Sequence, residues 1–443
     1  MEKRQKFPRV AREPDPPVGG TVQGRRVAVG MSGGVDSSVS AALLVERGYD
    51  VTGVFLECWN EPGCRAPEDR KDALSVALGL GIPFQVLDFQ KEYRKKVIEY
   101  FYREYEAGRT PNPDVVCNRE IKFGLFLRWA LNHGFDYVAT GHYARIGFGE
   151  LRSPNGNLLG HQRLRSKLRA KPEVFPGDMP GLGDQRKFVR LPAHHNRDGI
   201  GMYHLLQGID AKKDQSYFLY PLMQEQLAHV LFPVGHLTKK QVRREAKRRR
   251  LLTADKPDSV GICFVGEVDV GEFLRRRINE KTGDVVDTDG DVIGKHKGVW
   301  FYTIGQRHGF SISNKVQVTS DKLRHAIPPF YVVGKNVVRN QLIVGFGAET
   351  FRDKFQVADL HFINGIKNEE LTVMKGLQVR IRHGGELISS KLKVKNSKLF
   401  VELAEPQRGI APGQAAVFYL GDECLGGGII VEQQVSKDSS EKN

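Results

Sequence analysis

The sequence predicts an N-terminal α/β domain with a parallel sheet, followed by a mainly β remainder. Two observations support this prediction. Strand-like apolar runs alternate with helical stretches over the first third of the chain, and short β-type runs separated by turns dominate beyond about residue 283. The length of 443 residues, of which 40% are hydrophobic and 27% charged, corresponds to about two to four globular domains.

The alternation of strands and helices occupies the region from Val27 to Thr140. In chain order, the expected elements are Val27–Gly30, Asp36–Gly48, Val51–Leu56, Arg70–Leu80, Phe84–Leu87, Lys91–Tyr105, Ile121–Asn132 and Tyr137–Thr140. This order implies right-handed crossovers and a parallel sheet covered on both faces. Because ligands bind such sheets at the carboxyl ends of the strands, we expect residues 30–38 and 140–142 to line one edge.

Changes in composition divide the rest of the chain. We predict a flexible tail over 1–24, a first domain over 25–275, a small mainly β central domain over 276–338, a third domain over 339–433 and a tail over 434–443. The short strands of the third domain fit a β-barrel or a sandwich. Residues 149–201 form an insertion with ten Lys and Arg against five Asp and Glu. We expect this insertion to be mobile unless nucleic acid orders it.

Charge and cysteine content limit the class of protein. The net charge is +15 and the pI about 9.5, which predicts attraction to a polyanion, nucleic acid before anionic membrane; a merely basic enzyme is the alternative. No apolar run approaches the roughly 20 residues of a membrane span, so we expect a soluble protein without a membrane partner. Five scattered cysteines and the absence of a secretory signal favour the cytoplasm, with the mitochondrial matrix as the alternative.

A glycine-rich turn, residues 32–38, follows the first strand and opens the first helix. Glycines let the backbone approach a phosphate, while free N–H groups and the helix dipole bind the anion. Asp36 could hold Mg²⁺ or cap the helix. No lysine follows the glycines, so the turn is not a Walker A loop. It resembles the pyrophosphate loop of the ATP-pyrophosphatase group, whose members adenylate a carbonyl or carboxylate.

Two cysteines suggest sulfur chemistry. Two prolines fix an irregular segment that presents Asp114 and Cys117 just before a helix. The helix N-terminus and Arg119 should lower the pKa of the Cys117 thiol, and Asp114 is placed to move a proton. Cys263 lies on a separate segment bounded by glycines. Zinc would need two further ligands at short spacing, which are lacking, so we expect no metal site and favour sulfur or disulfide chemistry.

Together these motifs resemble those of the tRNA-specific 2-thiouridylases, which replace oxygen 2 of the wobble uridine with sulfur. The matching segments are residues 30–38, 108–118, 139–143, 213–219, 261–264, 303–307 and 412–419. The resemblance implies an adenine-nucleotide alpha-hydrolase-like catalytic domain that binds ATP. It also implies that the central domain and a C-terminal antiparallel β-barrel help to grip tRNA.

The resemblance further implies three sets of site residues. Cys117 would be the nucleophile, Cys263 the persulfide carrier and Asp114 the residue that handles protons. The ATP-binding set would be Gly30, Met31, Ser32, Gly33, Gly34, Val35, Asp36, Ser37, Leu56 and Gly141. The tRNA-binding set would be Asn112, Pro113, Asp114, His142, Lys213, Asp214, Gln215, Arg382, His383 and Gln414.

The implied reaction uses ATP with Mg²⁺ to adenylate oxygen 2 of the wobble uridine in the anticodon loop. Sulfur from a persulfide donor protein then replaces the oxygen, and the products are 2-thiouridine, AMP and pyrophosphate. We expect a disulfide between the two cysteines as the end state. Two alternatives stay open, namely another adenylating amidotransferase or synthetase on the same loop, and a non-catalytic tRNA-binding protein.

Overall fold

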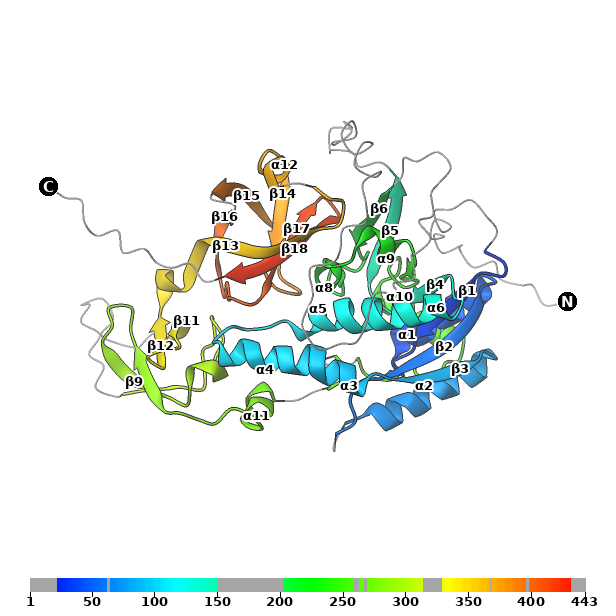
Figure 1. The fold of residues 1–443 in the computed structure, drawn as a ribbon, viewed down its shortest axis with the longest axis horizontal. Helices are drawn as coiled ribbons and strands as arrows, with labels where there is room; N and C mark the ends of the chain where they lie inside the picture. Colours follow the sequence, from blue (N-terminus) through cyan, green and yellow to red (C-terminus); the bar gives the residue numbers. More distant parts are fainter. Residues whose placement is uncertain are drawn as a thin grey trace, which may run out of the picture.

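The computed structural model describes residues 22–61, 64–149, 202–258, 261, 263–266, 269–313, 329–366, 368–395 and 398–431. Figure 1 shows a parallel sheet with its helices at one end of the molecule and two β-rich domains towards the other. The insertion at 149–201 and the two tails lie almost entirely outside the described residues, so their predicted mobility stays a prediction. Among the described residues, no helix has the length and apolar character needed to cross a bilayer.

The first domain contains the predicted parallel sheet, in the order β3-β2-β1-β4-β7. Its strands are β1 (Arg26–Gly30), β2 (Asp50–Glu57), β3 (Phe84–Asp88), β4 (Tyr137–Ala139) and β7 (Val230–Leu231). After β1 the chain adds β2 and β3 on one side and then returns to place β4 on the other. The strand order therefore reverses between β1 and β4, where open α/β sheets bind ligands.

Alternating side chains of the strands build a core on each face of this sheet. Val27 and Val29 of β1 belong to an apolar cluster that also includes buried residues of helices α1 (Val35–Glu46) and α2 (Ala66–Leu80). Ala28 belongs to the cluster on the opposite face, which includes aromatic residues of the helical stretches that follow β3. The strands β1, β2 and β4 are buried because both faces of the sheet are covered there, whereas the edge strand β3 is only partly buried.

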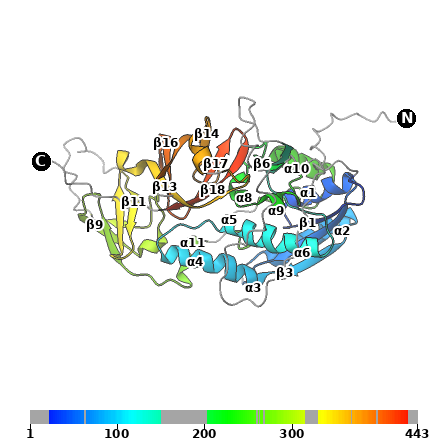
Figure 2. The ribbon, with the colours of Figure 1, turned by 45° about the horizontal axis from the view of Figure 1, so that its top comes forward.

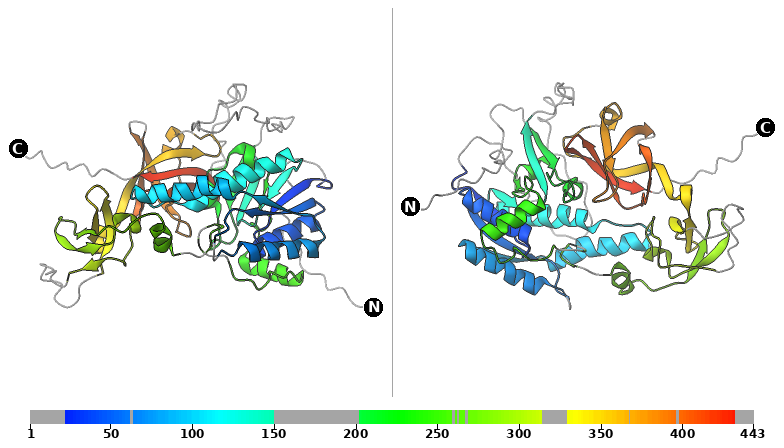
Figure 3. Two further views of the ribbon diagram at one scale, coloured as in Figure 1. Left: turned by 60° about the horizontal axis from the view of Figure 1, so that its bottom comes forward. Right: turned by 180° about the vertical axis from the view of Figure 1, so that it is seen from behind.

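Two long helical stretches run side by side from the sheet towards the β-rich domains (Figures 1 and 3). The first consists of α3 (Gln90–Tyr93), the π-helical η1 (Arg94–Ile98) and α4 (Glu99–Glu106). The second consists of α5 (Pro113–Cys117), the π-helical η2 (Asn118–Phe126) and α6 (Leu127–Asn132). The second stretch starts earlier than the predicted residue 121, because Asn112 caps it and Pro113 suits its first position.

Shorter elements complete the first domain. Strands β5 (Ala144–Gly149) and β6 (Met202–Gln207) pair as an antiparallel hairpin, and four helices follow it among the residues that the structure describes in this domain. These helices are α8 (Ser216–Leu219), α9 (Gln224–Leu227), α10 (Lys239–Arg248) and α11 (Val270–Arg275). Helix α10 packs against α1, and α11 lies next to α4.

The central domain is a five-stranded sheet in the order β10-β9-β8-β12-β11. Its strands are β8 (Gly283–Val286), β9 (Val292–His296), β10 (Ser311–Ile312), β11 (Tyr331–Asn336) and β12 (Gln341–Gly345), with η3 (Val299–Phe301) between β9 and β10. The domain boundary predicted at residue 338 would cut this sheet, because β12 pairs with both β8 and β11. The central sheet therefore extends to Gly345.

The third domain is a closed antiparallel barrel, so the barrel expectation is confirmed over the sandwich. After η4 (Gly347–Thr350) come β13 (Phe351–Phe362), α12 (Asn368–Thr372), β14 (Leu377–Arg380), β15 (Ile388–Lys395), β16 (Lys398–Arg408), β17 (Ala415–Leu420) and β18 (Glu423–Val431). The strand order is β13-β16-β15-β14-β17-β18, and pairing of β13 with β18 closes the ring. In Figure 2 the barrel lies between the central sheet and the first domain, to which β6 joins it by pairing with β18.

Candidate active site

The glycine-rich turn between β1 and α1 is shaped to receive an anion. Gly33 has a φ of +71°, and a Cβ built on it would lie 2.2 Å from the carbonyl oxygen of Asp69, so no other residue fits there. No side chain caps the N-terminus of α1 at Gly34. The first amides of a twelve-residue helix therefore remain available for a phosphate.

The loop after β4 meets this turn, as expected from the adjacent positions of β1 and β4. A Cβ on Gly141 would lie 2.7 Å from the backbone nitrogen of Ser37, which shows how closely the two segments approach. Leu56 lies near the end of the neighbouring strand β2 and is buried in the apolar cluster that also contains Ala28. The predicted ATP-binding residues thus lie at the carboxyl edge of one sheet.

Asp36 carries the carboxylate of this edge and is already engaged. Its two oxygens accept hydrogen bonds from Lys239 Nζ at 2.8 and 2.7 Å, and the hydroxyl of Tyr143 donates to it at 2.7 Å. Lys239 begins α10, part of a basic run for which the sequence alone left open whether its cations contact solvent or phosphate. In this structure the first of those cations, Lys239, pairs with Asp36 of the glycine-rich turn.

A second carboxylate, Asp258, shares the same lysine. Lys239 lies 2.9 Å from Asp258, which also pairs with Lys213 at 2.7 Å and with Arg243 at 2.6 Å. Although burial alone would raise it, hydrogen bonds from Lys213 and Lys239 hold the pKa of the Asp258 carboxyl well below its ordinary value. Three cations thus gather around Asp258, which lies beside the glycine-rich turn and five residues before Cys263 in the chain. Sequence reasoning missed this role of Asp258.

The two predicted cysteines lie in contact. The Cys117 thiol at the end of α5 donates a hydrogen bond to the Cys263 sulfur at 3.6 Å, and both cysteines are free. Asp114 accepts a hydrogen bond from the backbone nitrogen of Cys263 at 3.1 Å. The hydroxyl of Tyr93 donates to the Cys263 carbonyl oxygen at 2.5 Å. Hydrogen bonds from two separate helical stretches therefore hold the Cys263 backbone against the Cys117 thiol.

The acidity of the two thiols differs from the sequence-based expectation. Burial, with the hydrogen bond to Cys263, raises the pKa of the Cys117 thiol well above its ordinary value. The prediction of a lowered pKa is wrong because Cys117 lies inside the helix rather than before it, and because Arg119 Nε instead pairs with Glu120 at 2.9 Å. The hydrogen bond from Cys117 and the charge of Lys122 lower the pKa of Cys263. Burial raises the pKa of Asp114.

Several predicted tRNA-binding residues are buried or serve local contacts in this structure. His142 is buried between Phe123 and Phe232, and its Nδ1 lies 2.7 Å from Thr140 Oγ1. Asp214 forms a buried ion pair with Arg380 at 2.5 Å. Their predicted contacts with tRNA remain predictions.

The other predicted tRNA-binding residues lie nearer the cysteines or the barrel. Gln414 Nε2 donates to the carbonyl oxygens of Thr110 and Pro111, both at 3.0 Å, and so ties the barrel to the segment before α5. Asn112 and Pro113 begin α5 next to Asp114. Gln215 accepts a hydrogen bond from the Tyr143 backbone nitrogen. On the barrel, Arg382 and His383 are exposed, and the His383 ring packs 4.3 Å from that of Phe218.

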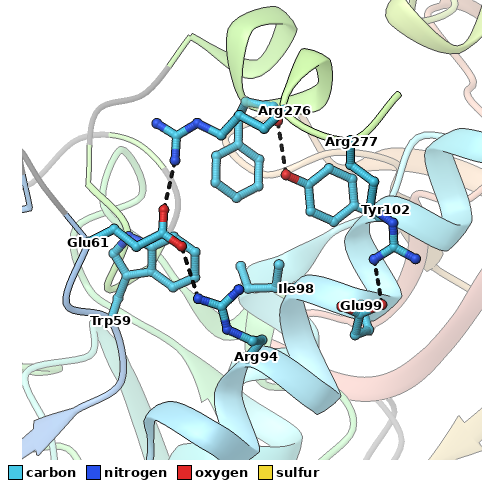
Figure 4. Close-up of a pocket in the computed structure, with 9 residues that line it drawn as sticks. Trp59, Glu61, Arg94, Ile98, Glu99, Tyr102, Arg276 and Arg277 are labelled. Carbon is cyan, nitrogen blue, oxygen red and sulfur yellow. Dashed lines mark hydrogen bonds and ion pairs between the residues drawn. The ribbon is translucent and has the colours of Figure 1, made fainter. Parts of the chain in front are cut away.

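A cavity of about 280 Å³ lies between the first long helical stretch, the segment after β2 and the region of α11 (Figure 4). Its arginines are all paired, because Arg94 and Arg276 share Glu61, at 2.9 and 2.8 Å, and Arg277 pairs with Glu99. Tyr102 donates a hydrogen bond to the carbonyl oxygen of Phe273 at 2.9 Å. These contacts attach the chain that follows Cys263 to the helical stretch, and we assign the cavity no ligand.

Comparisons with known proteins agree with this architecture. The chain matches family models described as a tRNA methyl transferase HUP domain at residues 25–166 and 190–267, a tRNA methyl transferase PRC-barrel domain at 271–346 and an aminomethyltransferase beta-barrel domain at 352–430. A protein of Streptococcus thermophilus (strain ATCC BAA-491 / LMD-9) named tRNA-specific 2-thiouridylase MnmA is 42% identical over 93% of this chain and 96% of its own length. A Streptococcus mutans protein of the same name is 42% identical over 91% and 95%.

Two solved structures match smaller parts of the chain. The U34-tRNA thiolase NcsA from Methanococcus maripaludis is 23% identical with a TM-score of 0.22, over 28% of this chain and 39% of that one. The NMN synthetase from Francisella tularensis is 22% identical with a TM-score of 0.20, over 26% and 43%.

Proposed function

The chain belongs to the tRNA-specific 2-thiouridylase family, and from that premise we propose that it thiolates the wobble uridine of tRNA at carbon 2. As a member of this family it is a sulfurtransferase that modifies tRNA and uses ATP. The observation that carries the proposal for this chain is the contact between Cys117 and Cys263 at 3.6 Å. A methyl transfer, which two of the family-model descriptions mention, would need neither this pair of thiols nor a phosphate loop.

In the proposed reaction, the wobble uridine leaves its stack and enters the site beside Asn112, Pro113 and Asp114. Chemistry on a base edge requires this access, which a single-stranded anticodon loop grants at low cost. Oxygen 2 of the uracil attacks the α-phosphorus of ATP and pyrophosphate leaves, while the proton of ring nitrogen 3 is lost. The amides at the start of α1 support binding of the phosphates at this edge.

Sulfur then replaces the adenylated oxygen. We propose that Cys263 carries a terminal sulfur received from a persulfide donor protein. Either this persulfide adds to carbon 2 and Cys117 then breaks the sulfur–sulfur bond, or Cys117 first releases sulfide, which adds to carbon 2. In both orders AMP departs and a Cys117–Cys263 disulfide remains, which a reductant must open. Asp114 contacts the Cys263 backbone nitrogen and burial raises its pKa, so it is suited to exchange protons beside the thiols.

Mg²⁺ would accompany the nucleotide. No group of three or more His, Cys, Asp or Glu side chains suited to a metal occurs among the described residues. An ion bound through substrate phosphates needs only one or two protein carboxylates, and Asp36 fits that need at the phosphate loop. The ion would neutralise phosphate charge, and Asp36 would hold it after exchanging its contact with Lys239. Free thiols support the reducing cytoplasm as the location, with the mitochondrial matrix as the alternative.

The decisive experiment is nucleoside mass analysis of a tRNA transcript incubated with the protein, ATP and a small-molecule persulfide. We expect 2-thiouridine at the wobble position together with AMP, and neither product when ATP is omitted. AMP release without a thiolated nucleoside, unchanged in a Cys117→Ser/Cys263→Ser double variant, would favour another adenylating enzyme. No AMP release in the presence of tRNA would favour a tRNA-binding protein.

A further inference from the structure

A lysine that the proposed mechanism does not use lies beside the two thiols. Lys122 is partly buried in η2, and its Nζ lies 5.6 Å from the centre of the Phe264 ring. Phe264 directly follows Cys263 and has a φ of +65°, so a strained backbone presents both residues. No carboxylate of the described part of the chain lies within ion-pair distance of Lys122. The nearby cations Lys96 and Arg119, in contrast, both pair with Glu120.

The π-helical geometry of η2 explains how Lys122 reaches the thiols. Cys117 and Lys122 are five positions apart, which in an α-helix places their side chains about 140° apart around the axis. A π-helix bonds residue i to i+5, so the wider turn brings Lys122 back towards the face of Cys117. Gly124 permits this turn, because a Cβ there would lie 2.7 Å from the carbonyl oxygen of Arg119. An α-helical interpretation of the sequence therefore could not find this lysine.

The charged and titratable groups around the Cys263 thiol come from four segments. Cys117 and Asp114 face it from α5, Lys122 from η2, Tyr93 from α3, and Cys58 from the segment after β2. Lys122 is the cation among them, and its contact with the ring of Phe264 places its charge next to the residue that follows Cys263. Burial alone would lower the pKa of Lys122, but the two sulfurs and Asp114 raise it, so the ammonium stays charged. Asp114 opposes the ionisation of Cys263, whereas Lys122 favours it.

We propose that Lys122 is a positioning residue that holds Cys263, rather than Cys117, as the thiolate, and so prepares Cys263 to take up sulfur. This inference rests on the proposed thiolation function only in naming the sulfur donor as a persulfide. In this arrangement the Cys117 thiol keeps its proton and donates a hydrogen bond to the Cys263 sulfur, 3.6 Å away. Cys117 then remains protonated and unreactive until sulfur has been loaded on its neighbour.

The loading step balances without a further oxidant or reductant. The Cys263 thiolate attacks the terminal sulfur of the donor R–S–SH, the sulfur–sulfur bond of the donor breaks, and R–S⁻ leaves. The new bond makes Cys263–S–SH. The Lys122 ammonium stabilises the negative charge on the Cys263 sulfur before the attack and keeps its own proton throughout.

The proposal can be tested on the whole protein without tRNA or ATP. Wild type and the variants Lys122→Gln, Lys122→Met and Lys122→Arg are treated with iodoacetamide over a series of pH values. Mass spectrometry of the Cys263 peptide gives the pH midpoint of alkylation. Arg119→Met is the matched control, because Arg119 lies three positions away on the same stretch and pairs with Glu120. Lys122→Gln is one atom shorter than lysine but keeps a hydrogen-bond donor, so a usable neutral variant remains if Lys122→Met does not fold.

We expect the Cys263 midpoint to rise by about one pH unit or more in both neutral variants, since a charge partner at this range typically shifts a pKa by that amount. Lys122→Arg should keep most of the wild-type midpoint, and Arg119→Met all of it. The rate of Cys263 persulfidation by glutathione persulfide at neutral pH should fall about three- to tenfold in the neutral variants. Gly124→Ala, which keeps the lysine but crowds the π-turn, should shift the midpoint in the same direction.

A midpoint unchanged in Lys122→Gln would overturn the proposal, as would an equal shift in Arg119→Met. The two proposals fail separately. If the alkylation midpoint of Cys263 shifts as expected in the Lys122 variants but the wild type forms no 2-thiouridine, the thiolation function is contradicted and the role of Lys122 stands. If the wild type forms 2-thiouridine but the Cys263 midpoint does not shift in the Lys122 variants, the thiolation function stands and the role of Lys122 is contradicted.

Discussion

The sulfur of Cys117 lies 3.6 Å from the sulfur of Cys263, although 146 residues separate them in the chain. A disulfide bond measures about 2.05 Å, so these are two separate thiols that need only a small movement to become one bond. One thiol belongs to a capped helix and the other to a segment that two helical stretches hold. This placement accommodates both the reduced state and the disulfide that the proposed reaction leaves behind.

Replacing either thiol should stop the reaction after tRNA has bound. We expect Cys117→Ser and Cys263→Ser each to lower 2-thiouridine formation below detection, because serine neither carries nor cleaves a persulfide. Nucleoside mass analysis measures the product, and a gel-shift titration should show tRNA affinity within about twofold of wild type, since a sulfur-to-oxygen change removes no cation.

Cys64→Ser is the matched control for these variants. Cys64 donates to the carbonyl oxygen of Trp59 and accepts from the Ala66 backbone nitrogen, and a hydroxyl can replace both hydrogen bonds. Thiolation by this variant should be unchanged. Appreciable thiolation by Cys117→Ser or Cys263→Ser would refute the two-thiol scheme.

Removing the carboxylate of the phosphate loop should stop the adenylation step. We expect Asp36→Ala to lower tRNA-dependent pyrophosphate release about a hundredfold or more, the typical effect of losing one charged group aimed at a reacting centre. The protein should still fold, because Lys239 keeps its ion pair with Asp258. Glu46→Gln, at the exposed far end of the same helix, should release pyrophosphate at the wild-type rate. Unchanged release by Asp36→Ala would contradict the assignment of the loop.

Binding of tRNA should weaken steeply as salt rises, because a chain of net charge +15 releases counterions from the phosphates that it contacts. With several such contacts, affinity should fall at least about tenfold between 50 and 200 mM salt. Filter binding over a salt series measures the slope. An isolated anticodon stem–loop, which offers fewer phosphates, should give a shallower slope. A salt-independent affinity for full-length tRNA would exclude binding driven by phosphate contacts.

The sequence was sufficient to predict the parallel sheet and the shared edge of Gly33 and Gly141. Strand patterns and glycine turns are local signals, and strand adjacency then brings the loops together. The domain boundary near residue 338 could not be found this way, because β8 and β12 pair across more than fifty residues. Pairing of this kind leaves no trace in local composition.

The electrostatics of the thiols were the least predictable part of the site. Proximity in sequence suggested Arg119 as the partner of Cys117, but Arg119 turns to Glu120. The cation near the thiols is instead Lys122, which a π-helical turn brings to that side of the helix. Such turns have no reliable sequence signature apart from a permissive residue such as Gly124. Asp258 was missed for a related reason, since its three cationic partners come from other segments.

Stability should depend on pH through the contact that joins the β5–β6 hairpin to the barrel. His204 of β6 lies 2.7 Å from Glu423 of β18. Burial alone would lower the pKa of His204, but the hydrogen bond and charge of Glu423 raise it above its ordinary value on balance. A raised histidine pKa adds stability that is complete below the unfolded value of about 6.5 and is lost as the pH rises through the folded value.

His204→Gln should therefore lower the free energy of unfolding more at low pH than at high pH. At pH 6 we expect it to lower the free energy of unfolding by about 1.5–3 kcal/mol, the usual contribution of a hydrogen bond to a charged group, and by less at pH 9. Urea unfolding of wild type and variant at several pH values measures the difference. His308→Gln changes an exposed histidine outside this contact and should show no such trend. Glu423 keeps its hydrogen bond from Asn364 in the variant, so a destabilisation that instead grows with pH would show that His204 is neutral in the folded protein.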